Sequence, residues 1–245
     1  MFRFCVLNIG NTHTQCAVVR YKSDEYSFDS FVQYDTSAIP FGELPTDIFM
    51  VYASVVPQIT AIMQKKFPQS IPCTAANVPF IDFSDAPPTL GMDRIANCAA
   101  LVQKYQDGII IDAGTAITLE VVKNKKFIGG AILPGIGILA RAMHDYTGAL
   151  PLIQCTNVPP IETLIPETLT AKAMEIGIQS ATAAGTLQLL DNFRKLLPEN
   201  SPVCVCGGAR KSILAQKTKT ELLDGGENFT LNGLSTIATY HLKKG

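Results

Sequence analysis

A short acidic, glycine and hydroxyl run follows a strongly apolar segment near the middle of the chain. Residues 108–111 include three consecutive isoleucines, and Asp112, Ala113, Gly114 and Thr115 come directly after them. Three β-branched apolar residues in a row indicate a strand buried on both faces. The glycine allows a tight turn in which backbone N–H groups approach an anion. We therefore predict a phosphate-binding turn with a carboxylate beside it for a cation.

The same arrangement occurs at the start of the chain. The two copies correspond at three positions, Asn8 with Asp112, Gly10 with Gly114, and Thr14 with Thr118. A single Asp-x-Gly occurs often by chance, whereas two strand–turn–strand copies indicate a duplicated domain with two phosphate-binding turns. The predicted domains are residues 1–107 and residues 108–245.

An adjacent acid and base form a second candidate group. Asp93 and Arg94 follow Gly91, and apolar residues at helical spacing come after them, so both belong to the first turn of a predicted helix. A carboxylate at this end of a helix often serves as a cap, and capping alone would explain Asp93. A cation is disfavoured there, so Arg94 needs another explanation. The pair suits an anionic substrate that carries a hydroxyl group.

Strands and helices alternate around these groups. Apolar patterning predicts strands near residues 2–7, 16–19, 48–53, 108–111, 118–122, 127–133 and 203–206. Helices are predicted from Pro57, over residues 93–102, 136–145 and 170–197, and after residue 234. This order is typical of an α/β protein.

The composition indicates an ordered chain without a general electrostatic partner. Of 245 residues, 47% are hydrophobic and 17% are charged, which suffices for a sizeable core. Twenty basic against 21 acidic residues give no argument for nucleic acid or an anionic membrane as a partner. The sequence contains no apolar run of about 18 residues, so no membrane-spanning helix is predicted. Seven cysteines scattered over apolar stretches predict reduced thiols and a cytoplasmic location.

Five segments together resemble the type III pantothenate kinase family. They are residues 8–12, 54–57, 91–94, 112–118 and 129–135. The most specific pair is Gly-Met-Asp-Arg at 91–94 with Asp-Ala-Gly-Thr-Ala at 112–116. The resemblance implies an α/β fold of duplicated ribonuclease H-like halves, as in the actin and sugar-kinase superfamily. The P-loop and dinucleotide-binding fingerprints are both absent from the sequence.

The same resemblance implies an activity and a role for each candidate residue. The activity is ATP-dependent phosphorylation of pantothenate to 4′-phosphopantothenate, the first step of coenzyme A biosynthesis, with Asp93 as the catalytic base. The implied substrate-binding residues are Gly91, Met92, Asp93, Arg94 and, from a neighbouring subunit of a homodimer, Thr170. The implied nucleotide-binding residues are Asn8, Ile9, Gly10, Asn11, Thr12, His13, Thr14, Gln15 and Thr115. ATP would come with Mg²⁺, and Asp112 would bind a monovalent cation, K⁺ or NH₄⁺.

The sequence departs from the family pattern at a few positions. The family has an aspartate where this chain has Asn8, and that carboxylate helps to hold magnesium near the phosphates. Asparagine keeps an oxygen acceptor but lacks the charge that Mg²⁺ prefers. Cys206 stands where a threonine is common, and the aromatic residue of the loop before Gly91 is shifted to Phe83 or replaced by Ser84. Two alternatives therefore remain beside the kinase. One is a catalytically weakened or silent relative with a regulatory or binding role, and the other is a different phosphotransferase or phosphatase of the superfamily.

Overall fold

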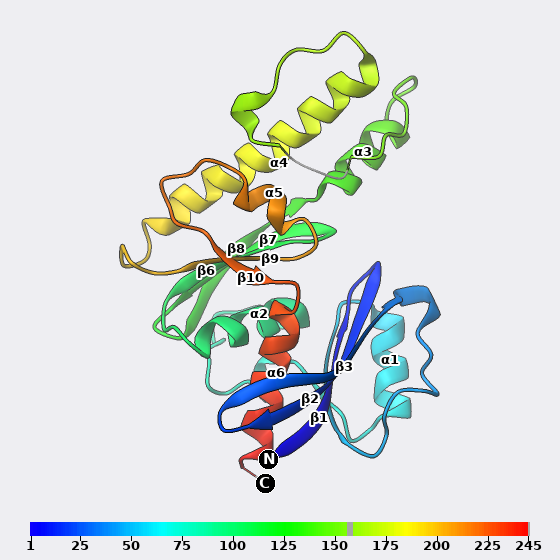
Figure 1. The fold of residues 1–245 in the computed structure, drawn as a ribbon, viewed down its shortest axis with the longest axis vertical. Helices are drawn as coiled ribbons and strands as arrows, with labels where there is room; N and C mark the ends of the chain where they lie inside the picture. The colour runs from blue at the N-terminus through cyan, green and yellow to red at the C-terminus, as the bar shows by residue number, and fades with distance from the viewer. Residues whose placement is uncertain (156–158, 245) are drawn as a thin grey trace. The chain divides into compact units, whose positions relative to one another are not determined.

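The computed structural model describes residues 1–155 and 159–244, and the chain forms two compact units (Figure 1). The first unit contains residues 1–106 and 125–127 and the C-terminal segment from Asn228 onward. The second unit contains residues 107–124 and 128–227. These units differ from the predicted halves mainly because the C-terminal helix groups with the first unit.

The first unit is built on a five-stranded sheet in the order β3-β2-β1-β4-β5. Its strands are β1 (Phe2–Ile9), β2 (His13–Lys22), β3 (Glu25–Asp35), β4 (Phe49–Ser54) and β5 (Ile71–Pro72). The first three strands form an antiparallel meander, whereas β4 runs parallel to β1 and β5 runs parallel to β4.

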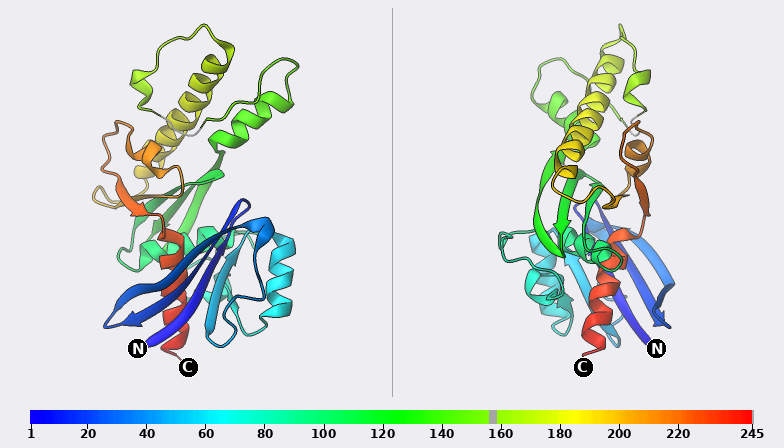
Figure 2. Two further views of the ribbon diagram at one scale, coloured as in Figure 1. Left: turned by 45° about the vertical axis from the view of Figure 1, so that its right-hand side comes forward. Right: turned by 90° about the vertical axis from the view of Figure 1, so that its left-hand side faces the viewer.

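Helices cover both faces of this first sheet (Figure 2). The helices are α1 (Pro57–Lys66), α2 (Met92–Val102) and α6 (Phe229–Leu242), with short 3-10 turns η1 (Thr36–Ala38) and η2 (Ala75–Asn77). Leu7 and Ile9 pack with Met63 of α1, whereas α6 packs against β1 and β4, and α2 packs against β4 and α6. Helices α2 and α6 approach so closely that a Cβ on Gly233 would collide with the carbonyl of Ala96.

The second unit is built on another five-stranded sheet, in the order β10-β9-β6-β7-β8. Its strands are β6 (Gly108–Ala113), β7 (Ala116–Lys123), β8 (Lys126–Pro134), β9 (Val203–Cys206) and β10 (Leu223–Gly226). Its helices are α3 (Ile136–Asp145), α4 (Thr170–Arg194) and α5 (Arg210–Leu214), with the 3-10 turn η3 (Ile161–Thr163). Ile109 and Ile111 pack with Val205 and with Leu190 of α4, and all three central isoleucines are 0% exposed, as predicted.

The two sheets repeat one plan. Each has a three-stranded antiparallel meander followed by two strands parallel to the first one. The turn between β2 and β3 and the equivalent turn between β7 and β8 also share a left-handed backbone conformation. Ser23 and Asp24 have φ of 53° and 64°, and Asn124 and Lys125 have φ of 51° and 58°. This repetition agrees with the duplication predicted from the two turns.

The strand register corrects one detail of the predicted repeat. Asn8 lies opposite Gln15 in the first sheet, whereas Asp112 lies opposite Thr118 in the second. The structural counterpart of Thr118 is therefore Gln15, and the predicted equivalence of Thr14 with Thr118 is wrong. The first turn contains one residue more than the second, which shifts the following strand by one position.

Two further findings bear on the composition. All seven cysteines are free thiols, and six of them are buried, as predicted. Among the residues that the structure describes, no helix combines the length and the hydropathy needed to cross a membrane.

Candidate active site

The first turn connects β1 to β2 and is closed by its own glycine. The N–H of Gly10 donates to the carbonyl of His13 at 3.0 Å, so this amide is used within the turn. Asn11, Thr12 and His13 are exposed. The backbone N–H groups that could meet an anion at this turn are therefore those of the residues after Gly10.

A buried pair of threonines holds the first turn in place. The hydroxyl groups of Thr14 and Thr36 lie 3.0 Å apart, and Thr36 donates to the carbonyl of Gly10 at 2.8 Å. The N–H of Thr36 also donates to the carbonyl of Thr12 at 3.0 Å. Thr36 was not predicted as a site residue, because nothing in the sequence links it to a turn more than twenty residues away.

The predicted nucleotide-binding residues 8–15 divide between the two faces of the sheet. Alternation along the paired strands places Asn8 and Gln15 on one face and Ile9 and Thr14 on the other. The latter two are 1% and 0% exposed, so their side chains belong to the core. The side chains available to a ligand are those of Asn8, Gln15 and the exposed turn residues, and His13 is 3.5 Å from the carboxylate of Asp35.

The acid–base pair stands at the start of α2, with Gly91 as the N-cap residue. The Asp93 carboxylate accepts the N–H of Arg94 at 2.8 Å, so it folds back over the first turn. A Cβ on Gly91 would lie 2.6 Å from that carboxylate, which explains why glycine precedes the pair. Met92 packs against the core cluster that contains Ile9, so this group and the first turn share one core.

The environment of Asp93 suits a proton acceptor. Burial raises the pKa of its carboxyl group, and hydrogen bonding to the Arg94 amide and the nearby Arg94 charge partly counteract this effect. A carboxylate with a raised pKa is a stronger base than an exposed aspartate.

The second turn connects β6 to β7 and is closed in the same way. The N–H of Gly114 donates to the carbonyl of Ala116 at 3.1 Å, and Thr115 is exposed. The N–H of Gly135 donates to the carbonyl of Thr115 at 3.2 Å, and a Cβ on Gly135 would collide with that carbonyl. The N-cap of α3 is therefore seated directly on this turn.

Oxygen ligands gather on the sheet face that carries Asp112. Thr118 lies directly opposite Asp112, and its buried hydroxyl has no hydrogen-bond partner among the described residues. Glu120 lies further along the same face and is 0% exposed. Burial and the charges of Asp112 and Glu120 raise the pKa of the Cys206 thiol well above its usual value. This electronegative site with hard oxygen donors fits a cation that is bound by oxygen atoms.

Gly207 follows β9 and lies against Asp112. Its φ is +86°, and a Cβ there would meet the Asp112 carboxylate and lie 2.7 Å from the carbonyl of Ala113. The glycine thus permits both the left-handed backbone and the close approach.

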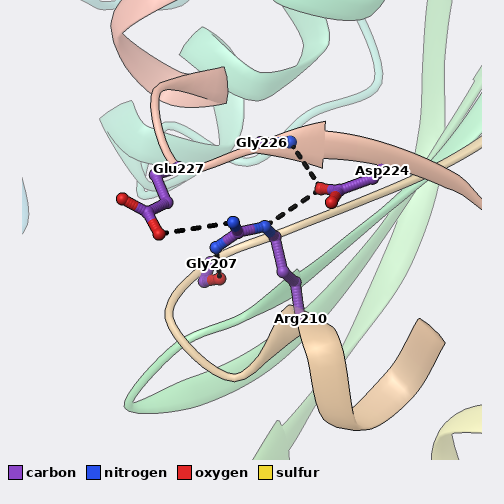
Figure 3. A network of polar contacts seen from close by, with 5 residues as sticks. All are labelled: Gly207, Arg210, Asp224, Gly226 and Glu227. Carbon is purple, nitrogen blue, oxygen red and sulfur yellow. Dashed lines mark hydrogen bonds and ion pairs between the residues drawn. The ribbon is translucent and has the colours of Figure 1, made fainter. Parts of the chain in front are cut away.

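Arg210 secures this glycine turn (Figure 3). Its Nη1 donates to the carbonyl of Gly207 at 3.5 Å, and its Nε donates to Asp224 at 3.0 Å. Nη2 donates to Glu227 at 3.3 Å. Arg210 is only 8% exposed, which is unusual for an arginine outside such a network. This role was not predicted from the sequence, because the acidic partners Asp224 and Glu227 lie 14 and 17 residues further along the chain.

Two other predictions concern Thr170 and metal ligands. Thr170 is the first residue of α4 and is exposed, as a residue that contacts a neighbouring subunit must be. Within residues 1–155 and 159–244, no group of three or more histidine, cysteine, aspartate or glutamate side chains is arranged to hold a metal ion.

Sequence comparisons identify the relatives of this chain. The family model of type III pantothenate kinase matches residues 4–191. The type III pantothenate kinase of Thermosynechococcus vestitus is 36% identical over 153 residues, which cover 62% of this chain and 58% of that protein. The one from Fervidobacterium nodosum is 27% identical over 251 residues, which cover 94% of each chain.

Solved structures share the fold. A Baf family protein from Campylobacter jejuni superposes with a TM-score of 0.64 at 20% identity, covering 98% of this chain and 99% of that one. A Sinorhizobium meliloti protein assigned as a 2-dehydro-3-deoxygalactonokinase gives a TM-score of 0.57 at 10% identity, covering 97% and 99%. A Listeria monocytogenes protein assigned as an N-acetylmannosamine kinase gives 0.55 at 14% identity, covering 98% and 99%. The predicted α/β fold of duplicated ribonuclease H-like halves is confirmed. Since the family model also matches most of its length, the chain belongs to the type III pantothenate kinase family.

Proposed function

We propose that this protein transfers the γ-phosphate of ATP to the 4′-hydroxyl of pantothenate, giving 4′-phosphopantothenate in the first step of coenzyme A biosynthesis. The observation that carries the proposal is the geometry of Asp93. Its pKa is raised by burial, and it is held over the first turn of α2, next to Arg94, by a glycine with no room for a side chain. This arrangement supplies a base and a cation for a substrate with a hydroxyl and a carboxylate.

Each member of the pair has a distinct task. Asp93 accepts the hydroxyl proton, for which it must lie within about 3 Å of the attacking oxygen. Arg94 binds the pantothenate carboxylate in a bidentate manner, which a lysine would not reproduce. Gly91 and Met92 complete the wall of the substrate site. Because phosphoryl transfer requires positioning and charge neutralisation more than covalent chemistry, these tasks account for much of the catalysis.

The nucleotide phosphates are assigned to the first turn, where Asn8, Gln15 and the exposed turn residues Asn11, Thr12 and His13 contact the phosphates of Mg²⁺-ATP. For Thr115, an exposed residue of the second turn, the family resemblance implies a nucleotide contact. Gly10, Ile9 and Thr14 shape the first turn through their backbone and packing, as their burial and the use of the Gly10 amide indicate.

The monovalent cation, K⁺ or NH₄⁺, is assigned to Asp112. The orphaned Thr118 hydroxyl and the buried Glu120 on the same sheet face support this assignment.

A homodimer completes the substrate site through Thr170. Large exposed apolar side chains concentrate in the part of the second unit between residues 128 and 169, and we call these side chains the apolar set: Ile128, Ile132, Ile138, Tyr146, Leu152, Ile165 and Leu169. A second copy of the chain would cover such residues. The seven free thiols support the cytoplasm as the location.

A weakened or silent relative with a regulatory role is the second candidate, and Asn8 is the observation that favours it. Asn8 lies at the end of β1 opposite Gln15, so neither of these paired positions supplies a charge to hold magnesium. Asp93, Arg94 and Asp112 favour the active enzyme.

A coupled ADP-release assay with pantothenate, ATP, Mg²⁺ and K⁺ decides between them. The active kinase releases ADP only when pantothenate is present, whereas folded protein that releases none supports the silent relative. In the same assay, Asn8→Asp is expected to lower the KM for Mg²⁺-ATP roughly tenfold, because one charge near a divalent cation at a solvent-open site contributes about 1–2 kcal/mol. An Asn8→Asp variant without any gain would contradict the role given to this position.

A further inference from the structure

The tip of the hairpin between β7 and β8 is joined to the loop that precedes α2. Residues 125–127 group with the first unit, although most of β7 and β8 belongs to the second. The N–H of Asp82 donates to the carbonyl of Lys125 at 2.9 Å, and the N–H of Phe127 donates to the carbonyl of Asp82 at 3.0 Å. Lys126 also forms ion pairs with Asp85 at 2.7 Å and Asp82 at 3.6 Å. These contacts fix the backbone of Phe127.

Phe127 forms an aromatic platform beneath Arg94. The Cζ atom of Arg94 lies 5.8 Å from the centroid of the Phe127 ring, within cation–π distance. The Phe127 ring also packs against the ring of Phe83, with the ring centroids 6.0 Å apart and the ring planes tilted by 36°. Phe127 is 5% exposed and Phe83 is 8% exposed, so the platform has little freedom to move.

These contacts also indicate the role of Phe83, the aromatic residue in the loop before Gly91. Phe83 is buried against Phe127, so it supports the platform and is not presented to a ligand.

We propose that Phe127 is a positioning residue that holds Arg94 for the carboxylate of the substrate. An arginine side chain has several rotatable bonds, and fixing it in one position costs conformational entropy. A cation–π contact acts on the face of the guanidinium group, whereas a bidentate substrate contact uses N–H donors in its plane, so the two contacts can act together. The inference rests on the proposed function, since it assumes that Arg94 binds the pantothenate carboxylate.

The test compares two substrates that differ only in that carboxylate. Pantothenol has a CH₂OH group in its place and retains the hydroxyl that is phosphorylated. Phe127→Leu is expected to raise the KM for pantothenate by about 3- to 30-fold, which is the range of a cation–π contact. The KM for pantothenol and the KM for ATP should match those of the wild type. A merely structural defect would affect both alcohol substrates alike.

Two further variants control for the loss of an aromatic ring. Phe80→Leu removes a ring that packs on Tyr240 in the same unit, with centroids 5.1 Å apart, and should leave the KM for pantothenate unchanged. Phe127→Tyr keeps the aromatic face and should therefore keep the KM for pantothenate close to the wild-type value. If Phe127→Leu does not fold, Phe127→Met, which fills a similar volume, takes its place.

A mutant cycle with Arg94 completes the test. In an Arg94→Gln background, Phe127→Leu should cause no additional rise in the KM for pantothenate. An equal rise for pantothenate and pantothenol, or no rise in the single variant, overturns the inference while leaving the kinase activity standing. Wild-type protein that releases no ADP with either substrate refutes the proposed function itself, and the inference with it.

Discussion

Asp93 is the residue on which the proposed chemistry depends. Its carboxylate is folded back onto the Arg94 amide at 2.8 Å, and burial raises its pKa. Burial makes the Asp93 carboxylate a better base, and the same burial of its charge lowers the free energy of unfolding. Activity and stability should therefore respond in opposite directions when this residue is changed.

Asp93→Asn is predicted to abolish most of the activity and to stabilise the fold. Loss of a general base lowers kcat by about 10²- to 10⁴-fold. The melting temperature of the variant at neutral pH should exceed that of the wild type, because asparagine fills the same volume without a buried charge. Circular dichroism melting and the ADP-release assay measure the two effects.

The pH dependence of this stabilisation provides its control. The folded-state pKa of Asp93 lies above the ordinary value of 3.8, so burial costs no stability below that value, where both states are protonated. As the pH rises above 3.8, the unfolded state ionises first, and the free energy of unfolding falls until the folded-state pKa is passed. The advantage of Asp93→Asn should thus be full near neutral pH and vanish in acid. A pH-independent difference, or full activity in the variant, would exclude the assigned role.

Local sequence was sufficient to nominate the residues for which we propose chemical roles, but not the residues that hold them. Asp93 and Asp112 stand out because each is an acid in a glycine-containing turn beside an apolar element. Thr36, Phe127 and Arg210 have no such signal, because each contacts a partner that is distant along the chain. Only the folded topology brings these pairs together.

At the scale of elements, the turn after β9 shapes the proposed cation site. Gly207 has φ of +86° and lies against the Asp112 carboxylate. Arg210 donates to the carbonyl of Gly207 at 3.5 Å (Figure 3). The turn therefore determines where Asp112 can be.

Gly207→Ala is predicted to destabilise the protein and to displace Asp112. A left-handed conformation costs a non-glycine residue about 1–3 kcal/mol, and the collision with the carboxylate adds to this cost. The K⁺ concentration needed for half-maximal activity should rise in the same variant.

Gly208 offers a matched control in the next position. A Cβ there meets nothing within 4 Å, so Gly208→Ala should leave both the melting temperature and the K⁺ requirement near wild-type values. Equal effects of the two alanine substitutions would argue against a specific role of Gly207.

Element boundaries were predictable where patterning was strong. Helix α1 begins at Pro57 and α3 spans Ile136–Asp145, as predicted. Strand β10 was not predicted, because Leu223–Gly226 has no apolar alternation and becomes a strand by pairing with β9. Helix α6 begins at Phe229, earlier than predicted, and most of residues 229–234 are buried within this first part of the helix.

At the scale of the whole molecule, duplication is the main organising feature. The chain uses the same strand order in both sheets, and in both it places a polar residue, Asn8 or Asp112, just before the turn that closes the first hairpin. This much was predictable, because the repeated turns are visible in the sequence. The one-residue difference between the turns was not, because register depends on hydrogen bonding between strands.

The proposed homodimer predicts a definite response to one surface charge. Sedimentation velocity should show a species of about twice the 26.4 kDa chain mass. Ile132→Glu, in the apolar set and 64% exposed, should shift the protein to monomers, because it buries a charge in the interface. Leu196→Glu, 49% exposed but outside that set, should leave the dimer intact. A monomeric wild type would contradict the assignment of Thr170 to a neighbouring subunit.

Transfer of the γ-phosphate itself tests the central claim most directly. The protein is incubated with pantothenate, Mg²⁺, K⁺ and ATP that carries radioactive phosphorus in its γ-phosphate, and the products are separated. We predict label in 4′-phosphopantothenate with the wild type and almost none with Asp93→Asn. Folded protein that leaves the label in ATP, or releases it only as inorganic phosphate, would contradict the account.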